Sequence, residues 1–384
     1  MTKEHSMNSE EPGSFVYENW KLSLSSKPLQ EVVEYPLFTD AHITGEIRDK
    51  YGPYQLLNTV PIPPDSGFLA PTIILRAEIY TDSPNRMPMD STNTVRFHGG
   101  LLSDEIAALV SLCLGVRVRA GGATRRFSPE GDPRGRPTNT WLFQNPTLVQ
   151  RVSSRIILPS ALGSHNLEQT YLLVYLPEIA SHQSIALIRA ARLYQDAIWV
   201  IESEPELSWL LLVSAIEIAA NHWFQAENDE MEILKEAKPD LVEFLEKAGG
   251  RDVVRKVAHE FAPISLSSKK FREFVINFLP DPPSERPEKS FLRVSWETQD
   301  MLKAMKQIYN YRSRALHGGI PFPLPMCQPA SMMKEEKSLG LATSAYGGTW
   351  LAKDMPMLLH VFEYIVRNSV LKWWRSMIPG EDND

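Results

Sequence analysis

The sequence predicts an α+β protein, with an N-terminal β-rich domain followed by an all-α helical bundle. Up to about residue 180, short runs of β-branched and aromatic residues alternate with turn-forming segments, which is typical of strands. From about residue 182, apolar residues recur every three or four positions, which is typical of amphipathic helices. The length of 384 residues exceeds that of one ordinary domain. We therefore expect residues 1–180 to form a β-rich sensing or positioning domain and residues 181–384 to form the bundle.

The strands expected in the first domain are rich in β-branched and aromatic residues. Prolines lie between many of these runs, where a residue that cannot donate to a sheet ladder is tolerated. The runs cover residues 72–80, 94–100, 115–122, 153–160 and 170–179. One helix is expected among them over residues 102–115, with Ser103 as its N-cap and Gly115 as its C-cap.

The helices expected in the second domain share an apolar face with helical spacing. They cover residues 184–202, 206–226, 229–248, 251–261, 267–279, 294–317 and 354–377. Residues 318–353, rich in Gly, Pro, Ser and Met, are too many for an ordinary connection between bundle helices, so this segment is either functional or mobile.

Charge and composition restrict the function classes. The net charge of -7 excludes a general electrostatic attraction to nucleic acid, so any such binding must come from a local basic patch. The N-terminal segment lacks the features of a signal peptide, no apolar stretch is long enough to cross a membrane, and there are two cysteines. We therefore expect a cytoplasmic protein with no membrane partner.

Several types of reactive site are missing from the sequence. The nine histidines show no metal-ligand spacing, and neither a phosphate-binding loop nor a Gly-x-Ser-x-Gly turn occurs. We therefore expect no metal site and no cofactor, and an NTPase or a serine hydrolase is unsupported.

The segment 296–319 carries the most informative pattern. Its apolar positions share one face, and an arginine lies in line with them: Met301, Met305, Ile308, Arg312 and Leu316 (or Ala315). A guanidinium desolvated on that face needs an anionic partner or several carbonyls. The helix is expected to stop at Gly318, which places His317 in its last turn near solvent.

The residues from Tyr311 to Gly318 resemble the signature that ends the last core helix of HEPN domains (higher eukaryotes and prokaryotes nucleotide-binding), particularly their Apea-like branch. The shared feature is an arginine, Arg312, followed five positions later by a histidine, His317. Upstream, residues 190–220 are similar to the first two helices of that branch. The resemblance covers about residues 184–320.

The resemblance implies an endoribonuclease that uses no metal and acts in antiphage defence or as a toxin. Imidazole groups titrate near neutral pH, so His317 is assigned as the acid or base. Arg312 is assigned as the group that stabilises charge on the phosphoryl oxygens, through a planar fork that lysine lacks. Ser313 departs from the family, where Asn, Asp or His often follows the arginine, and this bears on activity more than on fold.

Two other interpretations remain open. The helical domain could be a non-catalytic module that dimerises or binds a nucleotide or a protein, with Arg312 in a structural ion pair and His317 capping the last helical carbonyls. The chain could also be a subunit of a larger complex, with the N-terminal domain as the surface that contacts a regulatory partner or trigger.

Further residues are expected to support the site. Glu217 lies on one face of its helix and is expected to hold Arg312 or the helix entry in place. A pair with another arginine, or a carboxylate at a polar edge, is equally compatible. Tyr311 could contact RNA or simply pack. The segment 318–353 begins directly after His317, so it should cover or border the site.

Two basic segments could contact RNA phosphates, or could be solvated surface instead. The first contains six arginines, opposed by Glu130 and Asp132: Arg117, Arg119, Arg125, Arg126, Arg134 and Arg136. The second contains Lys269, Lys270 and Arg272.

Helix geometry favours a homodimer. Five residues correspond to about 140° of rotation on an ideal helix, so Arg312 and His317 of one helix do not easily reach one phosphate. Two copies related by a two-fold axis would place each His317 near the partner's arginine. The Met-rich face of 296–317 could form this interface or could be core within the monomer.

Overall fold

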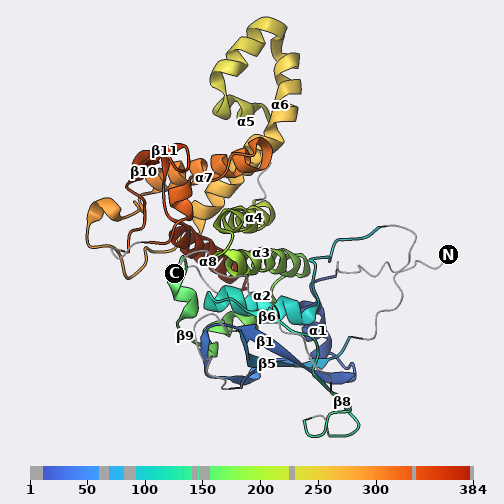
Figure 1. Cartoon of the computed structure of the whole chain (residues 1–384). Coiled ribbons are helices and arrows are strands. Elements are labelled where there is room, and N and C mark those ends of the chain that lie inside the picture. The colour runs from blue at the N-terminus through green and yellow to red at the C-terminus, as the bar shows by residue number, and fades with distance from the viewer. Residues whose placement is uncertain are drawn as a thin grey trace, which may run out of the picture. The chain divides into compact units, whose positions relative to one another are not determined.

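The computed structural model describes residues 12–59, 69–81, 92–132, 134–140, 146, 156–224, 230–330 and 334–380. It confirms the α+β class, with an antiparallel sheet in the N-terminal part and a mostly helical region after it (Figure 1). The chain divides into two compact units. The first contains residues up to Glu204 together with those from Trp373 onward, and the second is Pro205–Lys372.

The first unit is built on a seven-stranded sheet within the described residues, in the order β3-β4-β5-β1-β7-β8, with β6 also paired to β1. These strands are β1 (Glu31–Thr39), β3 (Ile47–Tyr51), β4 (Tyr54–Asn58), β5 (Ala70–Ile79), β6 (Arg119–Ala120), β7 (Arg125–Phe127) and β8 (Asn139–Thr140). The central pair β1–β5 is antiparallel, with Val33 opposite Ala77. The short strands β2 (His42–Thr44) and β9 (Ser164–Asn166) form a separate parallel pair.

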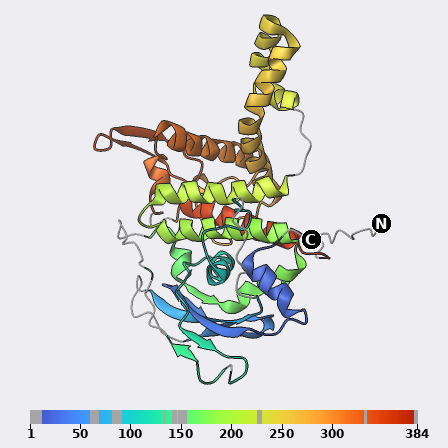
Figure 2. The same ribbon diagram turned by 90° about the vertical axis from the view of Figure 1, so that its right-hand side faces the viewer.

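Helix α2 (Leu102–Leu114) is the buried centre of this unit. It packs against β6, α1 (Phe15–Ser23) and α3 (Ser181–Val200), and Figure 2 shows it end-on between the sheet and α3. Its residues from Glu105 to Leu114 are all buried, so α3 completes the cover of α2 and belongs to this unit. The division after Glu204 therefore falls beyond residue 180, where the sequence placed the domain boundary.

The ends of α2 differ in how well they could be predicted. Gly115 is the C-cap, with the left-handed φ of 70° that favours glycine. Ser103 is not the N-cap, because the helix begins one residue earlier. Its N-cap is Leu101, whose N–H donates to the Asp104 carboxylate at 2.8 Å.

The sheet uses fewer of the expected strands than the sequence suggested. Strand β5 confirms the strand at 72–80, and β6 is all that forms within 115–122. Residues 94–100 form turns, and 170–179 lies mainly in the 3-10 helix η2 (Leu167–Glu178), so both of these strand predictions are wrong. In the range 153–160, residues 156–160 form no strand and the rest lies outside the described residues.

The second unit is mainly helical, as expected. Its helices are α4 (Pro205–Trp223), α5 (Glu230–Ala237), α6 (Pro239–Asn277), α7 (Thr298–Gly318) and α8 (Leu359–Ser376), whose last residues belong to the first unit. The helix expected over 229–248 is broken at Lys238, and the helices expected at 251–261 and 267–279 are one continuous segment. Gly250 interrupts α6 with a φ of 72° and joins two helical segments. A two-stranded hairpin, β10 (Gly340–Thr343) and β11 (Gly348–Leu351), is an exception to the expected all-α architecture.

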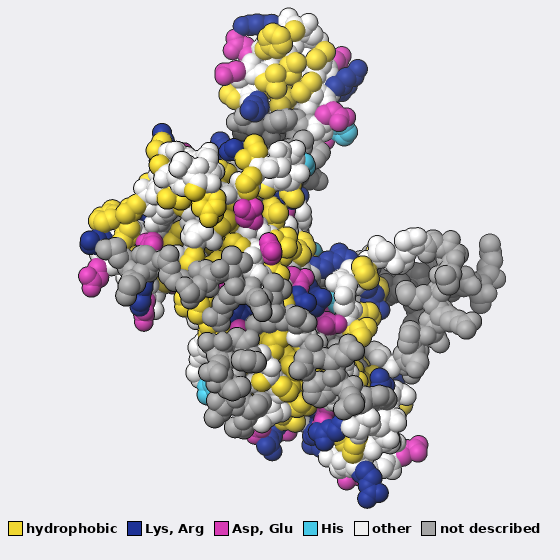
Figure 3. All heavy atoms as spheres, viewed as in Figure 1, with side chains coloured by type: hydrophobic (Ala, Val, Ile, Leu, Met, Phe, Trp, Pro, Cys, Tyr) yellow, Lys and Arg dark blue, Asp and Glu magenta, His cyan; other side chains and the backbone are white. Residues whose placement is uncertain are grey.

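Two hydrophobic clusters lie within this unit. In one, the Trp209 ring on α4 stacks on Phe322 and Phe362, with ring centres 5.3 and 4.7 Å away. The other contains only α5 and α6 residues, namely Leu234, Val242, Val254 and Ala258. We call residues 230–260 the α5–α6 hairpin. Its visible surface combines hydrophobic side chains with both basic and acidic ones (Figure 3).

Candidate functional site

Helix α7 positions both residues of the predicted catalytic pair. Met301, Met305 and Ile308 are fully buried, which confirms the apolar face. These methionines are therefore core within the monomer and do not supply a dimer interface. Leu316 was expected on the same face, but 51% of it is exposed, because the core that covers α7 ends before its last turn.

The Arg312 guanidinium is held by a carboxylate from α4. Arg312 Nη2 lies 2.8 Å from Glu217 Oε2, and the two side chains are 21% and 17% exposed. The hydroxyl of Tyr309 donates to the other oxygen of Glu217 at 2.9 Å. The contact between Arg312 and Glu217 agrees with the expectation from sequence, whereas their roles stay predictions.

Tyr309 is a member of this cluster that sequence reasoning missed. Burial raises the pKa of Tyr309 to about 12, and the negative charge of Glu217 adds to the effect, so the phenol is a neutral donor at physiological pH. The Arg312 guanidinium lies 5.7 Å from the centre of the same ring. The available signal was spacing, because Tyr309 lies four residues after Met305 and three before Arg312 on the buried side of α7.

Part of the guanidinium has no protein partner. Arg312 Nε is buried and makes no hydrogen bond to any described residue. A charge-assisted donor in this condition is costly, and an anionic oxygen nearby would satisfy it. Glu217 therefore fixes the position of Arg312, and 21% of the Arg312 side chain remains exposed to solvent.

His317 has different surroundings. It is exposed, and no hydrogen bond joins it to a described residue. The carbonyl of Arg314 accepts from the N–H groups of Gly319 and Ile320, so backbone donors cap the end of α7. The Arg314 carbonyl is therefore capped by backbone N–H groups and not by the His317 side chain, which is the structural role that the sequence left open.

The helix remains regular through this region. Helix α7 is continuous to Gly318, and Gly319 ends it with a left-handed φ of 61°. Arg312 and His317 therefore keep the separation of about 140° around the axis that an ideal helix gives. One copy of α7 presents the arginine toward α4 and the histidine toward solvent.

The other two residues predicted near the site have clear surroundings. The Tyr311 hydroxyl donates to the Asp354 carbonyl, and its ring lies 6.1 Å from that of Phe322. This geometry favours packing over RNA contact, the second of the two interpretations given to Tyr311. Ser313 is half-buried.

The segment 318–353 borders the site and is anchored at two points. Phe322 stacks on Trp209, and the carbonyl of Met326 accepts from Trp209 Nε1 at 3.4 Å. Further on, the buried Glu336 accepts from Arg286 Nε and Nη2 at 2.8 and 2.6 Å. The contact between Phe322 and Tyr311 brings the start of this segment against α7.

The six arginines of 115–137 differ in their surroundings. Arg117 is 2% exposed and its guanidinium lies 2.8 Å from Asp40, so the predicted RNA contact does not fit its position. Most of the others also face carboxylates in this unit: Arg119 with Asp196, Arg125 with Glu34, Arg126 with Glu31, and Arg134 with Glu78. Arg136 is exposed. Ion pairing with neighbouring acids therefore neutralises most of this segment.

Within the described ranges, no cluster of three or more His, Cys, Asp or Glu side chains has the arrangement of a metal site. None of the described helices is both long and apolar enough to cross a membrane. No protein-family model matches the chain, and neither curated proteins nor solved structures include a significant match.

Proposed function

We propose that the second unit is a metal-independent RNA endonuclease of HEPN type, in which His317 acts as acid or base and Arg312 stabilises the transition state. The observation that carries this proposal is the contrast between the two residues. The guanidinium is fixed by Glu217 and Tyr309 with a buried, unbonded Nε, while His317 is exposed at the end of the same helix. A fixed cation can stabilise charge on the phosphoryl oxygens, and an accessible imidazole can act as the acid or the base, in metal-free RNA cleavage.

The proposed reaction is an internal transfer of the phosphodiester. A base takes the proton of the ribose 2′-hydroxyl, whose oxygen attacks the adjacent phosphorus while an acid protonates the departing 5′-oxygen. The products are a 2′,3′-cyclic phosphate and a 5′-hydroxyl. Arg312 would donate to the phosphoryl oxygens as negative charge grows on them.

The active species in this proposal is a homodimer with a composite site. His317 of one copy would act beside Arg312 of the other, because the continuous α7 separates the two residues around its axis. The Met-rich face is buried in the monomer, so the contact would use the exposed end of α7. Leu316 and Ile320, which flank His317, are 51% and 46% exposed.

The biological part of the proposal rests on the resemblance to HEPN domains. It is a role in antiphage defence or as a toxin in the cytoplasm, with RNA as the substrate. The first unit would receive a regulatory partner or trigger.

One observation favours a second candidate function. The pair between Arg312 and Glu217 has the geometry of a structural ion pair, and Tyr309 adds a further hydrogen bond to it. A non-catalytic module that dimerises or binds a nucleotide or protein would need no more from these residues. In that case the loss of Arg312 would affect folding stability and no chemistry.

The test is cleavage of RNA by the purified full chain in EDTA, with analysis of the new ends. We expect cyclic phosphate and 5′-hydroxyl ends, and no cleavage by His317→Ala or Arg312→Ala. His259→Ala is a matched control, because His259 is an exposed histidine of the same unit, on α6. Equal cleavage by His317→Ala and the parent would remove His317 from the mechanism, and absence of cleavage by the parent would favour the non-catalytic module.

A further inference from the structure

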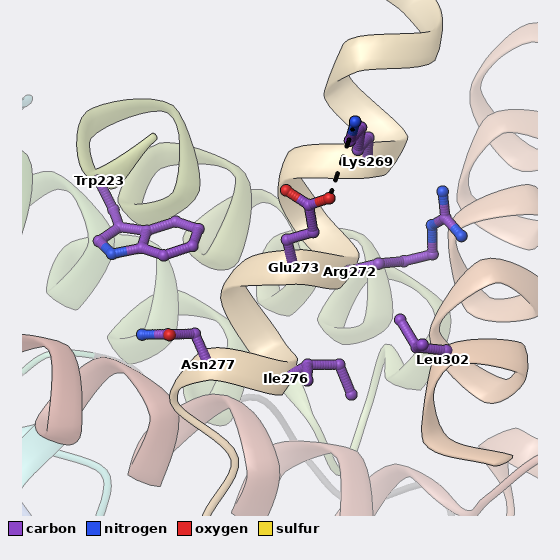
Figure 4. Close-up of a pocket in the computed structure, with 7 residues that line it drawn as sticks. All are labelled: Trp223, Lys269, Arg272, Glu273, Ile276, Asn277 and Leu302. Atoms are coloured by element: carbon purple, nitrogen blue, oxygen red, sulfur yellow. Dashed lines mark ion pairs between the residues drawn. The ribbon is translucent and has the colours of Figure 1, made fainter. Parts of the chain in front are cut away.

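A shallow cavity lies along the C-terminal part of α6, within the second unit. Its volume is about 500 Å³, and α4 and α7 contribute its remaining walls. The lining residues are Trp223, Lys269, Arg272, Glu273, Ile276, Asn277 and Leu302. Figure 4 shows Trp223 and Asn277 on one side of α6 and Arg272 on the other, with Glu273 between them. We call this cavity the α6 groove.

Arg272 gives the α6 groove a cation with spare donors. Its Nε donates to the Ser268 carbonyl at 3.2 Å, and its terminal nitrogens have no acceptor among the described residues. Lys269 lies 4.0 Å from Glu273, and Lys270 follows on the same turn of α6. Three cations against one carboxylate make this stretch of helix locally basic, although the whole chain is acidic.

Aromatic rings lie beside these cations. Trp223 is half-buried and supported by Phe274 and Phe278, with ring centres 5.9 and 5.6 Å away. The Lys270 ammonium lies 5.6 Å from the centre of the Phe224 ring. Cations interleaved with a supported aromatic platform are typical of sites for single-stranded nucleic acid, where a base stacks and a phosphate pairs.

Two polar side chains can distinguish one base from another. Glu273 presents carboxylate oxygens, which accept from the amino group of cytosine but repel a carbonyl in the same place. Asn277 lies on the Trp223 side of the groove and offers both a donor and an acceptor (Figure 4). The groove therefore favours a base that carries an exocyclic amino group.

The α6 groove shares α4 and α7 with Glu217, Tyr309 and Arg312, which we call the Arg312 cluster. Leu302 precedes Arg312 by about 15 Å along α7, and Glu217 precedes Trp223 by about 9 Å along α4. Phe271 of α6 packs against Tyr309, with ring centres 5.4 Å apart. A strand of RNA that occupies one site therefore needs only a few nucleotides to reach the other.

We propose that the α6 groove binds a single-stranded RNA substrate, with one base on Trp223, the amino edge of that base toward Glu273 and Asn277, and the phosphate of a neighbouring nucleotide at Arg272 on the other side of α6. This inference rests on the proposed endonuclease function, because it names how the strand is held beside the Arg312 cluster. It predicts that cytidine is bound better than uridine.

The test measures binding separately from cleavage. Short 2′-O-methyl oligocytidine and oligouridine lack the attacking hydroxyl, and their affinity for the full-length chain is read by fluorescence anisotropy at several salt concentrations. We expect oligocytidine to bind more tightly. Arg272→Ala should weaken binding by about fivefold or more and lower the salt slope by about 0.7, the value for one phosphate contact on a single strand. Arg255→Ala, a loss of the same charge elsewhere on α6, should change neither quantity.

Two further variants test the base contacts. Trp223→Leu should weaken both oligonucleotides by about fivefold or more, because stacking does not depend on the base. Glu273→Gln should reduce the preference for cytidine, since an amide also donates to uridine. Circular dichroism of Trp223→Leu checks its folding, and Arg272→Ala decides the result if that variant unfolds.

The outcomes separate this proposal from the endonuclease function. Binding unchanged in Arg272→Ala, or no binding of either oligonucleotide by the parent, would overturn the groove proposal even if RNA is cleaved. Equal competition by free cytidine monophosphate would overturn it as a strand-binding site. Groove-dependent binding without any cleavage of ordinary RNA would refute the endonuclease function and leave the groove proposal standing.

Discussion

The substitution Glu217→Gln tests whether the Arg312 cluster contributes to stability. It preserves the side-chain volume and one acceptor oxygen, but it removes the charge that Arg312 faces at 2.8 Å. A hydrogen bond to a charged group contributes about 1.5–3 kcal/mol. Because both side chains are about one-fifth exposed, solvent weakens their attraction relative to a fully buried pair. We therefore expect the free energy of unfolding to fall by about 2 kcal/mol.

The assay is urea unfolding followed by tryptophan fluorescence. With a slope of about 2 kcal/mol per molar urea, the midpoint should fall by about 1 M. The matched control is Glu243→Gln, which removes the same charge from an ion pair with Lys247. The two charged groups are 2.5 Å apart, but 69% of the Glu243 side chain is exposed. Exposed pairs contribute little, so this control should change the free energy by at most about 0.5 kcal/mol.

A double-mutant cycle with Tyr309→Phe adds a second measurement. Tyr309 and Glu217 share one hydrogen bond, so the double variant should lose less free energy of unfolding than the sum of the two single variants. If Glu217→Gln has the midpoint of Glu243→Gln, the cluster makes no net contribution and the reasoning above is refuted. If the two compact units unfold in separate transitions, the expected shift belongs to the transition of the second unit.

Three other outcomes follow from the structure. Burial, and then the charge of Glu217, raise the pKa of Tyr309 to about 12. The contribution of this phenol to stability should therefore be complete below pH 10 and disappear as the pH rises toward 12. Tyr309→Phe should lack this part of the alkaline unfolding curve. Glu336→Gln should lower the free energy of unfolding by about 3 kcal/mol in the same urea assay, because it leaves Arg286 without its buried partner, and a loss below 1 kcal/mol would contradict this account. Mixing inactive Arg312→Ala with excess inactive His317→Ala should restore RNA cleavage through mixed dimers, whereas a parent that light scattering shows to be monomeric and fully active would exclude a composite site.

The helical spacing of apolar residues predicted burial correctly wherever neighbouring elements cover that face of the helix. The spacing of Met301, Met305 and Ile308 predicted the buried face of α7, and all three are fully buried. The same spacing placed Leu316 (or Ala315) on this face, but Leu316 is 51% exposed and Ala315 is half-buried. Periodicity identifies the face of a helix, but the point at which neighbouring helices stop covering it is set by tertiary structure.

Strand predictions failed where burial and periodicity gave ambiguous signals. Residues 170–179 are rich in Leu and Tyr, but Leu172, Leu173 and Leu176 are buried from one side of a 3-10 helix. Strand β1 was missed because it is buried on both faces and includes the fully buried Glu34. The carboxylate of Glu34 is neutralised by Arg76 from β5, a partner that only the sheet register identifies.

The sequence indicated which kinds of residue form the site, but it did not identify the partners of each one. The arginine on an apolar helix face required an anion, and Glu217 supplies one from α4. Arg117 carries the same charge in a Gly-rich and Arg-rich segment, which suggested exposure. Its partner Asp40 lies far away in the sequence, so burial of this pair could not be inferred from local composition.

The separate core of the α5–α6 hairpin has a consequence for how this part of the chain unfolds. Leu234, Val242, Val254 and Ala258 contact one another within the hairpin, so opening it removes only the contacts that it makes internally. Amide hydrogen exchange there should report a smaller opening free energy than exchange in α4 or α7, which pack against each other and against α6. A proline in place of Val254 should accelerate exchange along the hairpin while the Arg312 cluster remains protected. We therefore expect the hairpin to unfold as a separate cooperative unit, which could be exchanged or lost without unfolding the helices that carry the site.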